Sequence, residues 1–213
     1  MRGFKKQPVP PPVIETIIEV AKRALSSMTT QPWCIHVLTG EPLERVRRHN
    51  MEEMIAGVKP KRDILTHGEN QGVHRQRQVD IAKKLFGAMG IARDDKPMRQ
   101  DWVLRGFRQF DASVSLALTY DRALDPGAVC HFDVGALCYG IVLAAWDRGL
   151  SSVINGQGIM RSDIVREVAE IPDDQVIMTC VAMGYPDDSF PANDVRSDRK
   201  EHEEFVRYVG FAE

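Results

Sequence analysis

The 213-residue sequence lacks most of the features that would assign it to a specialised class of protein. No apolar run approaches the roughly 20 residues that cross a bilayer, and the first six residues lack the apolar segment of a signal peptide. Charge of one sign is not in excess: the net charge is -2 and the pI is near 6.3, so the overall field does not attract nucleic acid or anionic lipid. We therefore expect a cytoplasmic protein with a small-molecule partner, and neither nucleic acid nor a membrane as a partner.

Cysteine and histidine patterns that indicate cross-links or metal sites are also missing. Cys34, Cys130, Cys138 and Cys180 form no C-x-x-C pair, and we expect reduced core thiols and no disulfide framework. The six histidines show no H-E-x-x-H spacing, so no metal site is expected. No G-x-S-x-G sequence places a serine nucleophile.

What is present is the composition of one ordinary globular domain. Hydrophobic residues make up 43% and charged residues 27%, which excludes a disordered or fibrous chain. The length supports one substantial core, so residues 1–213 are expected to form a single domain.

Helical and strand patterns alternate along the chain. The segment 133–149 is apolar almost all round, which predicts a helix deep in the core that stops at Gly149. The alternation predicts an α+β or α/β domain with a central sheet. Helices are expected at residues 13–25, 42–54, 78–89, 97–110, 133–149 and 161–170, and strands at 33–39, 113–120, 151–154 and 176–183.

Two polar segments interrupt this pattern. Residues 57–75 contain few apolar side chains and predict a long loop, of the kind that often covers a site as a lid. Residues 187–213 predict a C-terminal arm whose end carries Phe205, Val206, Val209 and Phe211. A tail this apolar is expected to pack on its own subunit or on a partner subunit.

Hydroxyl and amide side chains gather in residues 25–33, between a predicted helix and a predicted strand. Ser26, Ser27, Thr29 and Gln31 offer many donors and acceptors within one turn. From this local chemistry alone, an ordinary connection closed by Pro32 is the more frequent explanation. Residues elsewhere in the chain decide between a site and a plain turn.

Several segments, in the same order, resemble the nitroreductase family. Residues 25–33 are similar to its P-S-S-x-N-x-Q-P-W sequence, and residues 199–206 to its R-x-x-x-E-E-F-V sequence. The remaining matches are residues 2–4 with the end of R-R-S-x-R-x-F, 149–152 with G-L-G-S, 171–174 with I-P-D-D and 182–187 with A-x-G-Y-P-D. The resemblance therefore covers nearly the whole chain.

The resemblance implies both a fold and an activity. The implied fold is α+β, with a central, mostly antiparallel sheet flanked by helices and with FMN at a homodimer interface. The implied activity is that of an FMN-dependent NAD(P)H oxidoreductase that reduces nitroaromatic or similar electron-poor acceptors by a ping-pong mechanism. Because the flavin carries the chemistry, no catalytic side chain is expected.

The resemblance also assigns the residues that surround the flavin ring. Ser26, Ser27, Thr29 and Gln31 are expected along the flavin and its ribityl chain. Arg2 is expected near the pyrimidine edge, where a guanidinium stabilises the negative charge of the reduced ring.

The remaining cofactor contacts are expected near N5 and the phosphate. Gln157 and Gly158 match the loop beside N5, where a backbone N–H bonds the nitrogen that accepts the hydride; without the family context, a Gly-rich turn with no ligand is equally good. Arg199 matches the arginine that binds the phosphate, and Arg196 is the near alternative. Met28, the 57–74 loop and the 78–89 helix are expected to contribute to the substrate pocket.

Two departures from the family pattern bear on cofactor binding. Thr29 replaces the usual asparagine, and the arginine and serine upstream of Arg2 are missing. Either the true start lies further upstream or FMN is held less tightly. The same scaffold reducing an activated alkene, a haloaromatic or a flavin is one alternative, and a flavin-binding protein without turnover is another. The sequence assigns neither the natural acceptor nor NADH or NADPH as the reductant.

Overall fold

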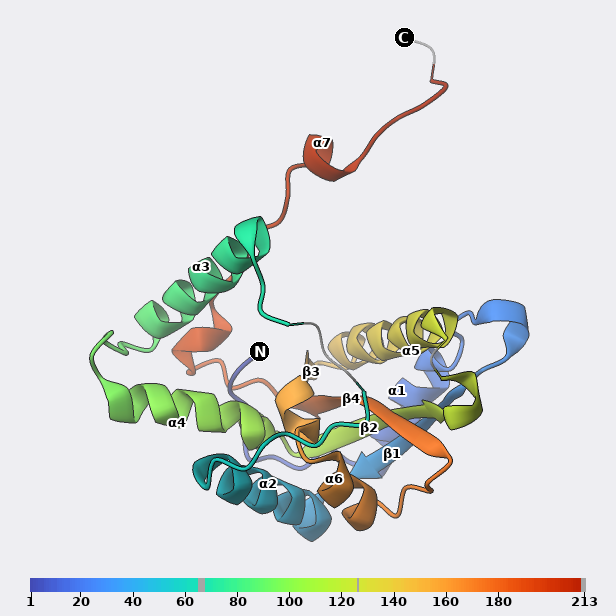
Figure 1. Ribbon diagram of the computed structural model, residues 1–213, viewed down its shortest axis with the longest axis horizontal. Helices are drawn as coiled ribbons and strands as arrows, with labels where there is room; N and C mark the ends of the chain where they lie inside the picture. The colour runs from blue at the N-terminus through green and yellow to red at the C-terminus, as the bar shows by residue number, and fades with distance from the viewer. Residues whose placement is uncertain (65–67, 126, 212–213) are drawn as a thin grey trace.

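The computed structural model describes residues 1–64, 68–125 and 127–211 (Figure 1). Its helices are α1 (Pro11–Ala21), α2 (Gly40–Ile55), α3 (Gly72–Ala88), α4 (Lys96–Phe107), α5 (Ala128–Asp147), α6 (Ser162–Val168) and α7 (His202–Phe205). Its strands are β1 (Trp33–Leu38), β2 (Val114–Asp121), β3 (Ser151–Ile154) and β4 (Gln175–Gly184). All predicted helices and strands are present, and the largest differences are at helix ends.

The helix ends differ from the sequence pattern for local reasons. The helix predicted at 13–25 ends at Ala21, because its last turn tightens and the Ala24 N–H donates to the Ala21 carbonyl. The helix predicted at 78–89 begins at Gly72, so the predicted 57–75 loop ends earlier, and residues 65–67 of it lie outside the described residues. Its polar first turns gain side-chain pairs such as Gln76 to Asp80 at 2.8 Å, which an apolar pattern does not reveal.

The four strands form one antiparallel sheet in the order β1-β2-β4-β3. Trp33 lies opposite Tyr120, Val114 opposite Met183, and Ser151 opposite Gly184. This confirms the predicted α+β class with a mostly antiparallel central sheet. β2 and β4 occupy the centre, which explains why their sequences read as nearly continuous apolar runs.

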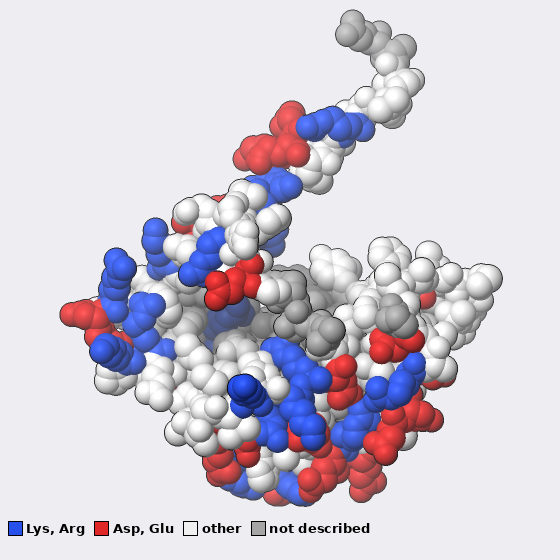
Figure 2. Space-filling view, viewed as in Figure 1, with Lys and Arg blue, Asp and Glu red and all other residues white. Residues whose placement is uncertain are grey.

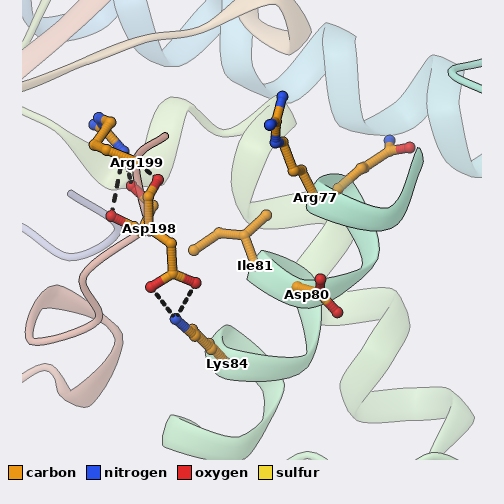
Figure 3. A pocket seen from close by; sticks show the side chains of 8 residues that line it. Arg77, Asp80, Ile81, Lys84, Asp198 and Arg199 are labelled. Carbon is orange, nitrogen blue, oxygen red and sulfur yellow. Dashed lines mark hydrogen bonds and ion pairs between the residues drawn. The ribbon is translucent and has the colours of Figure 1, made fainter. Parts of the chain in front are cut away.

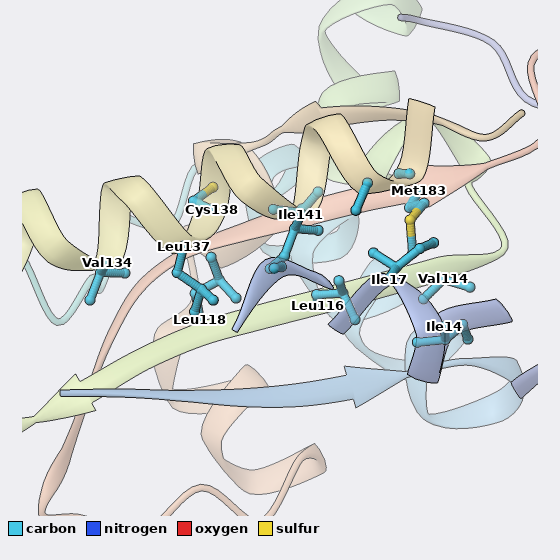
Figure 4. Close-up of a cluster of buried hydrophobic side chains, with 14 of the residues drawn as sticks. Ile14, Ile17, Val114, Leu116, Leu118, Val134, Leu137, Cys138, Ile141 and Met183 are labelled. Carbon is cyan, nitrogen blue, oxygen red and sulfur yellow. The ribbon is translucent and has the colours of Figure 1, made fainter. Parts of the chain in front are cut away.

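Helices cover both faces of this sheet (Figure 1). On one face, α1 and α5 pack on β2, where Leu116 and Leu118 meet Leu137 and Ile141 (Figure 4). On the other face lie α2 and α6, packed against residues such as Ala117 of β2. Neighbouring β2 residues thus point to opposite cores, as the pleat of a strand requires.

Helix α5 is longer and more apolar than the sequence reading allowed. Among the described residues it is the one helix that could cross a membrane by length and composition, so the expectation that no run approaches this length was wrong. The core helix of a soluble protein passes the same test, and α5 buries Val134, Leu137 and Ile141 against α1 and the sheet. Gly149, with φ of +71°, follows its end as predicted.

The cysteine prediction was correct for three residues and wrong for the fourth. All four are free; Cys130, Cys138 and Cys180 are buried, and burial raises the pKa of Cys180 to about 12. Cys34 is exposed: it lies near the start of the edge strand β1, four residues from the buried Leu38 on the same face.

Helices α3 and α4 and the C-terminal arm lie outside these layers, on one side of the sheet (Figure 1). α3 has no buried residue, and the ion pair of Lys84 with Asp198, at 2.7 Å, ties it to the arm. Before α3, the Lys61 N–H donates to the Met160 carbonyl at 2.9 Å, and the Asp63 carboxylate accepts the Ile177 N–H at 2.9 Å. The first part of the predicted loop is therefore attached to the sheet layers.

Candidate functional site

The turn between α1 and β1 brings four of the predicted site residues together. Met28, Thr29 and Gln31 have φ of 48°, 59° and 45°, a left-handed conformation that non-glycine residues seldom adopt. The turn is closed by the Gln31 N–H, which donates to the Ser26 hydroxyl at 2.9 Å. Met28 is 92% exposed, and the Thr29 and Gln31 side chains are also exposed. Backbone strain held in place beside exposed polar side chains is typical of ligand-binding turns.

A buried carboxylate of α5 holds this turn in position. Asp133 is 3% exposed, and its Oδ2 accepts the Ser27 N–H at 3.1 Å. Sequence reasoning missed Asp133 as a site residue, because 106 positions separate it from Ser27. Its place near the start of α5 was the only available signal.

Arg2 lies in a short segment that a single asparagine clamps. The Asn193 Oδ1 accepts the N–H groups of Arg2, at 2.7 Å, and Gly3, at 3.1 Å, while its Nδ2 donates to the Gly3 carbonyl at 2.8 Å. Nη2 of Arg105, in the last turn of α4, donates to the Arg2 carbonyl at 3.0 Å. Asn193 and Arg105 are positioning residues that the sequence reading did not find.

The Arg2 guanidinium is desolvated without a carboxylate partner. Its central carbon lies 4.9 Å from the centre of the Phe110 ring, and Nη1 donates to the Met1 carbonyl at 2.7 Å. Among the described residues no carboxylate pairs with it, and burial lowers the pKa of Arg2 from its usual range. A half-buried cation of this kind favours an anionic group beside it, because such a group offsets the loss of hydration.

Gln157 and Gly158 form a tight turn (Gly156–Ile159) after β3. A Cβ on Gly158 would lie 2.6 Å from the Cys180 Sγ, so packing alone requires glycine there. The Gln157 N–H donates to the Asn155 Oδ1 at 3.0 Å, and the Gly158 N–H to the Asn155 carbonyl at 3.3 Å. A ligand atom at this turn has to share or replace an Asn155 contact.

The two arginines considered for a phosphate contact lie in different places. Arg199 lines a cavity of about 340 Å³ between α3 and the arm, and its Nη1 bonds the Ser197 Oγ at 2.6 Å (Figure 3). Nη1 of Arg196 donates at 2.8 Å to the carbonyl of Asn193, the residue that clamps Arg2. Arg196 is therefore the nearer of the two to Arg2 along this network.

The predicted site residues fall into two groups at opposite ends of α5. The turn with Ser26, Ser27, Thr29 and Gln31 is attached at Asp133. Residues of the last turn of α5, including Trp146, line a cavity of about 590 Å³ with Met1 and Arg196. A helix rises 1.5 Å per residue, so the 13 steps from Asp133 to Trp146 place the groups about 20 Å apart.

Gln157 belongs to the same group as Arg2. Its Nε2 donates weakly, at 3.5 Å, to the Val103 carbonyl of α4, and its side chain covers Gly106. Arg105, on the same helix, holds Arg2. Arg2 and Gln157 thus both contact the C-terminal end of α4. No metal-binding group of three or more His, Cys, Asp or Glu side chains occurs in the described part of the chain.

Comparison with known proteins identifies relatives of the whole chain. It is 35% identical over 212 residues to the chloronitrobenzene nitroreductase of Comamonas testosteroni, covering 98% of this chain and 92% of that one. It is 34% identical to the nitrobenzene nitroreductase of Ectopseudomonas oleovorans, with the same coverage. The crystal structure of the FMN-dependent nitroreductase NfnB from Mycobacterium smegmatis in complex with NADPH superposes with a TM-score of 0.89 at 25% identity, covering 98% of this chain and 92% of that one.

The sequence model of the nitroreductase family matches residues 1–185, which include the strained turn, the clamped Arg2 segment and the turn after β3. The predicted resemblance is thereby confirmed by an independent match to most of the chain. This chain belongs to the nitroreductase family.

Proposed function

We propose that the protein is an FMN-dependent NAD(P)H oxidoreductase that reduces nitroaromatic compounds. The observation that carries this proposal is the desolvated Arg2 guanidinium, which has no carboxylate partner among the described residues and which, like Gln157, contacts the C-terminal end of α4. The relatives support it: two are nitroreductases of nitrobenzene and chloronitrobenzene, and a third is FMN-dependent and binds NADPH. When bound, FMN supplies the hydride chemistry.

Each residue group then has a distinct task. Arg2 stabilises negative charge at the pyrimidine edge of the reduced ring; Asn193 and Arg105 hold its backbone, and the Phe110 ring lies against its guanidinium. The exposed Thr29 and Gln31 side chains bind polar edges of the flavin. Gln157 covers the end of α4 and limits access of water to the ring.

We infer a homodimer because one chain cannot bring its two residue groups to one flavin. They lie about 20 Å apart along α5. A two-fold axis across α5 places two such helices antiparallel, so the turn of one subunit meets the Arg2 group of the other. The outer face of α5 suits this contact: Phe132 is 79% exposed, Trp146 is 71% exposed, and Tyr139 and Leu143 lie between them.

The arm supports the same assembly. Phe205, Tyr208, Val209 and Phe211 are all exposed, and Figure 1 shows the arm leaving the body of the subunit beyond α3. A partner subunit that covers these side chains removes an apolar surface that is otherwise costly to leave in water. Of the two expectations for the tail, packing on a partner is the one we propose.

Two arginines of the arm, Arg196 and Arg199, are candidates for binding the phosphate of FMN. Arg199 keeps the family position, whereas Arg196 shares Asn193 with Arg2. We expect the substitution of the phosphate ligand by glutamine to weaken FMN binding about 10- to 100-fold, the loss of one charge-assisted hydrogen bond. Fluorescence titration of Arg196→Gln and Arg199→Gln with FMN identifies the ligand as the variant with the weaker binding.

The central experiment measures flavin content and turnover of the purified protein. We expect a flavin spectrum, an FMN stoichiometry of one per chain, and NAD(P)H oxidation that depends on nitrobenzene under low oxygen. Turnover only with an activated alkene, a haloaromatic or free flavin would replace the proposed acceptor. A flavin spectrum without any acceptor-dependent turnover would reject the enzyme and leave a flavin-binding protein.

A charge on the outer face of α5 tests the dimer. Trp146→Glu places a carboxylate in the proposed interface, and we expect the dimer dissociation constant to rise at least about 100-fold, with loss of FMN at the same protein concentration. Met54→Glu, on the exposed side of α2, is the matched control. Sedimentation that shows equal association of both variants would contradict the proposed interface.

A further inference from the structure

A basic cleft lies between α3 and α4, apart from the residues assigned to the flavin. Its volume is about 650 Å³, and it is lined by α3, by the connection that follows it, and by Arg99 of α4. Four of the lining residues are cations and none is acidic: Arg75, Lys83, Arg93 and Arg99. The apolar floor is formed in part by Phe86 and Ile91.

None of the four cations has a carboxylate partner in the described part of the chain. Arg75 bonds only the Gln78 amide oxygen, at 2.9 Å, and the Arg99 guanidinium lies over the Phe86 ring, 4.3 Å from its centre. The side chains of Lys83 and Arg93 are exposed and form no hydrogen bond or ion pair with the described residues. Figure 2 shows several Lys and Arg side chains over this part of the molecule, with acidic side chains at the tip where α3 connects to α4.

Three carboxylates lie near the cleft in sequence, those of Asp80, Asp94 and Asp95, and none of them lines it. Asp95 caps α4 by accepting the Met98 N–H at 3.0 Å, and Asp80 accepts a hydrogen bond from the Gln76 amide. Lys84, on another side of α3, is the lysine that pairs with Asp198. No acidic side chain lines the cleft or forms an ion pair with its four cations in the described part of the chain, so the cleft has an excess of positive charge that favours a ligand with more than one negative charge.

The cleft lies within reach of the Arg2 group along one face of α4. Arg99, Val103 and Gly106 are spaced by four and three residues, so they share a face of this helix. Val103 and Gly106 are the residues that Gln157 covers. The seven steps from Arg99 to Gly106 span about 10 Å, a distance that a dinucleotide bridges and a single aromatic ring does not.

We propose that this cleft binds the 2′-phosphate of NADPH and gives the protein a preference for NADPH over NADH. The inference rests on the proposed function for the position of the nicotinamide ring. A phosphate monoester carries close to two negative charges and accepts bidentate arginine contacts, which matches Arg93 and Arg99 with Lys83 beside them. A carboxylated acceptor carries one charge and, bound here, would hold its nitro group away from the Arg2 group.

The kinetic test compares the two reductants in variants that lose one charge. For Arg99→Gln and Lys83→Gln we expect KM for NADPH to rise about 10-fold each, while KM for NADH and kcat with either reductant stay within about 2-fold. Arg48→Gln, which removes an exposed charge from α2, is the matched control and leaves all four values unchanged. Equal effects on NADH and NADPH would overturn the proposal.

A binding test keeps the inference separate from turnover. Calorimetric titration with adenosine 2′,5′-bisphosphate is expected to show saturable binding that Arg99→Gln and Lys83→Gln each weaken about 10-fold, whereas 5′-AMP binds weakly to all forms. If the bisphosphate binds in this way but neither reductant is oxidised, the proposed function fails and the phosphate site stands. If NADPH and NADH are oxidised equally well and the bisphosphate does not bind, the inference alone fails.

Discussion

Helices α5 and α3 are similar in length and opposite in environment. α5 has 20 residues, eight of them buried, and packs on α1 and the sheet. α3 has 17 residues and none is buried. The first helix is held by apolar burial within its own subunit, whereas the second is held mainly by polar ties such as Lys84 to Asp198.

This difference indicates that one region of the molecule provides stability and the other provides groups that can bind a ligand. Burial of apolar side chains in the sheet and α5 supplies most of the favourable free energy of folding, and α5 positions the strained turn through Asp133. The α3–α4 region adds little to the core but presents unpaired cations and two cavities. Elements with few buried contacts open at low cost, which suits a cover over a site.

The sharpest test of this comparison uses the same substitution in both helices. Leu137→Ala in α5 removes a fully buried side chain, and we expect the free energy of unfolding to fall by about 2–5 kcal/mol. Leu85→Ala in α3 removes a half-buried one, and we expect a loss below about 1 kcal/mol. Urea unfolding at fixed protein and FMN concentrations measures both, and equal losses would refute the division into two regions.

A pair of glycines tests where the packed region ends. A Cβ on Gly158 would meet the Cys180 Sγ at 2.6 Å, so we expect Gly158→Ala to lower stability by about 1–3 kcal/mol and to weaken FMN binding. Gly156, two residues earlier, has only the Arg62 guanidinium near its Cβ position, at 3.5 Å and beyond. We expect Gly156→Ala to change stability by less than about 0.5 kcal/mol in the same thermal scans. If Gly156→Ala lowers stability more than Gly158→Ala, the packed region does not end between these two residues.

The smallest expected effect concerns the polar attachment before α3. Hydrogen bonds from Arg161 hold the pKa of Asp163 at about 2, below its ordinary 3.8, and Lys61 pairs with the same carboxylate at 3.3 Å. A lowered pKa in the folded state stabilises the protein above pH 4, and this contribution is lost as the pH falls from about 4 to about 2.

Asp163→Asn is therefore expected to reduce stability by about 1 kcal/mol or less at pH 7, because the pair is partly exposed. The deficit should shrink in urea titrations as the pH is lowered below 4. A deficit that is the same at pH 7 and pH 3 would assign the effect to packing rather than to charge.

The order and type of the helices and strands were predictable, because apolar residues recur with a different spacing in helices and in strands. The apolar run of 133–149, the strand at 151–154 and the apolar strand before Gly184 all appear where the pattern placed them. The end of α1 and the start of α3 were not predictable. A tightening last turn and a polar first turn leave no mark in apolar spacing.

The site was predictable only in its residues, not in its arrangement. Ser26, Gln31 and Arg2 are predictions from the family resemblance, whereas the residues that hold them, Asp133, Asn193 and Arg105, were not predicted, because each acts through a contact with a distant part of the chain. The exposure of Cys34 was likewise missed, because the position of β1 at the edge of the sheet is a property of the tertiary structure.

The sequence by itself predicted a domain of helices and strands around a central sheet, and through its resemblance to the nitroreductase family it predicted the α+β class and the antiparallel sheet. Those follow from local periodicity and from short motifs, which are properties of neighbouring residues. Only the tertiary structure decided that Arg2 is desolvated, that Arg2 and Gln157 both contact α4, that the turn of Ser26 is attached at Asp133 of α5, and that four cations line a cleft between α3 and α4. Contacts between residues distant in sequence depend on how the layers pack, and no local pattern encodes that packing.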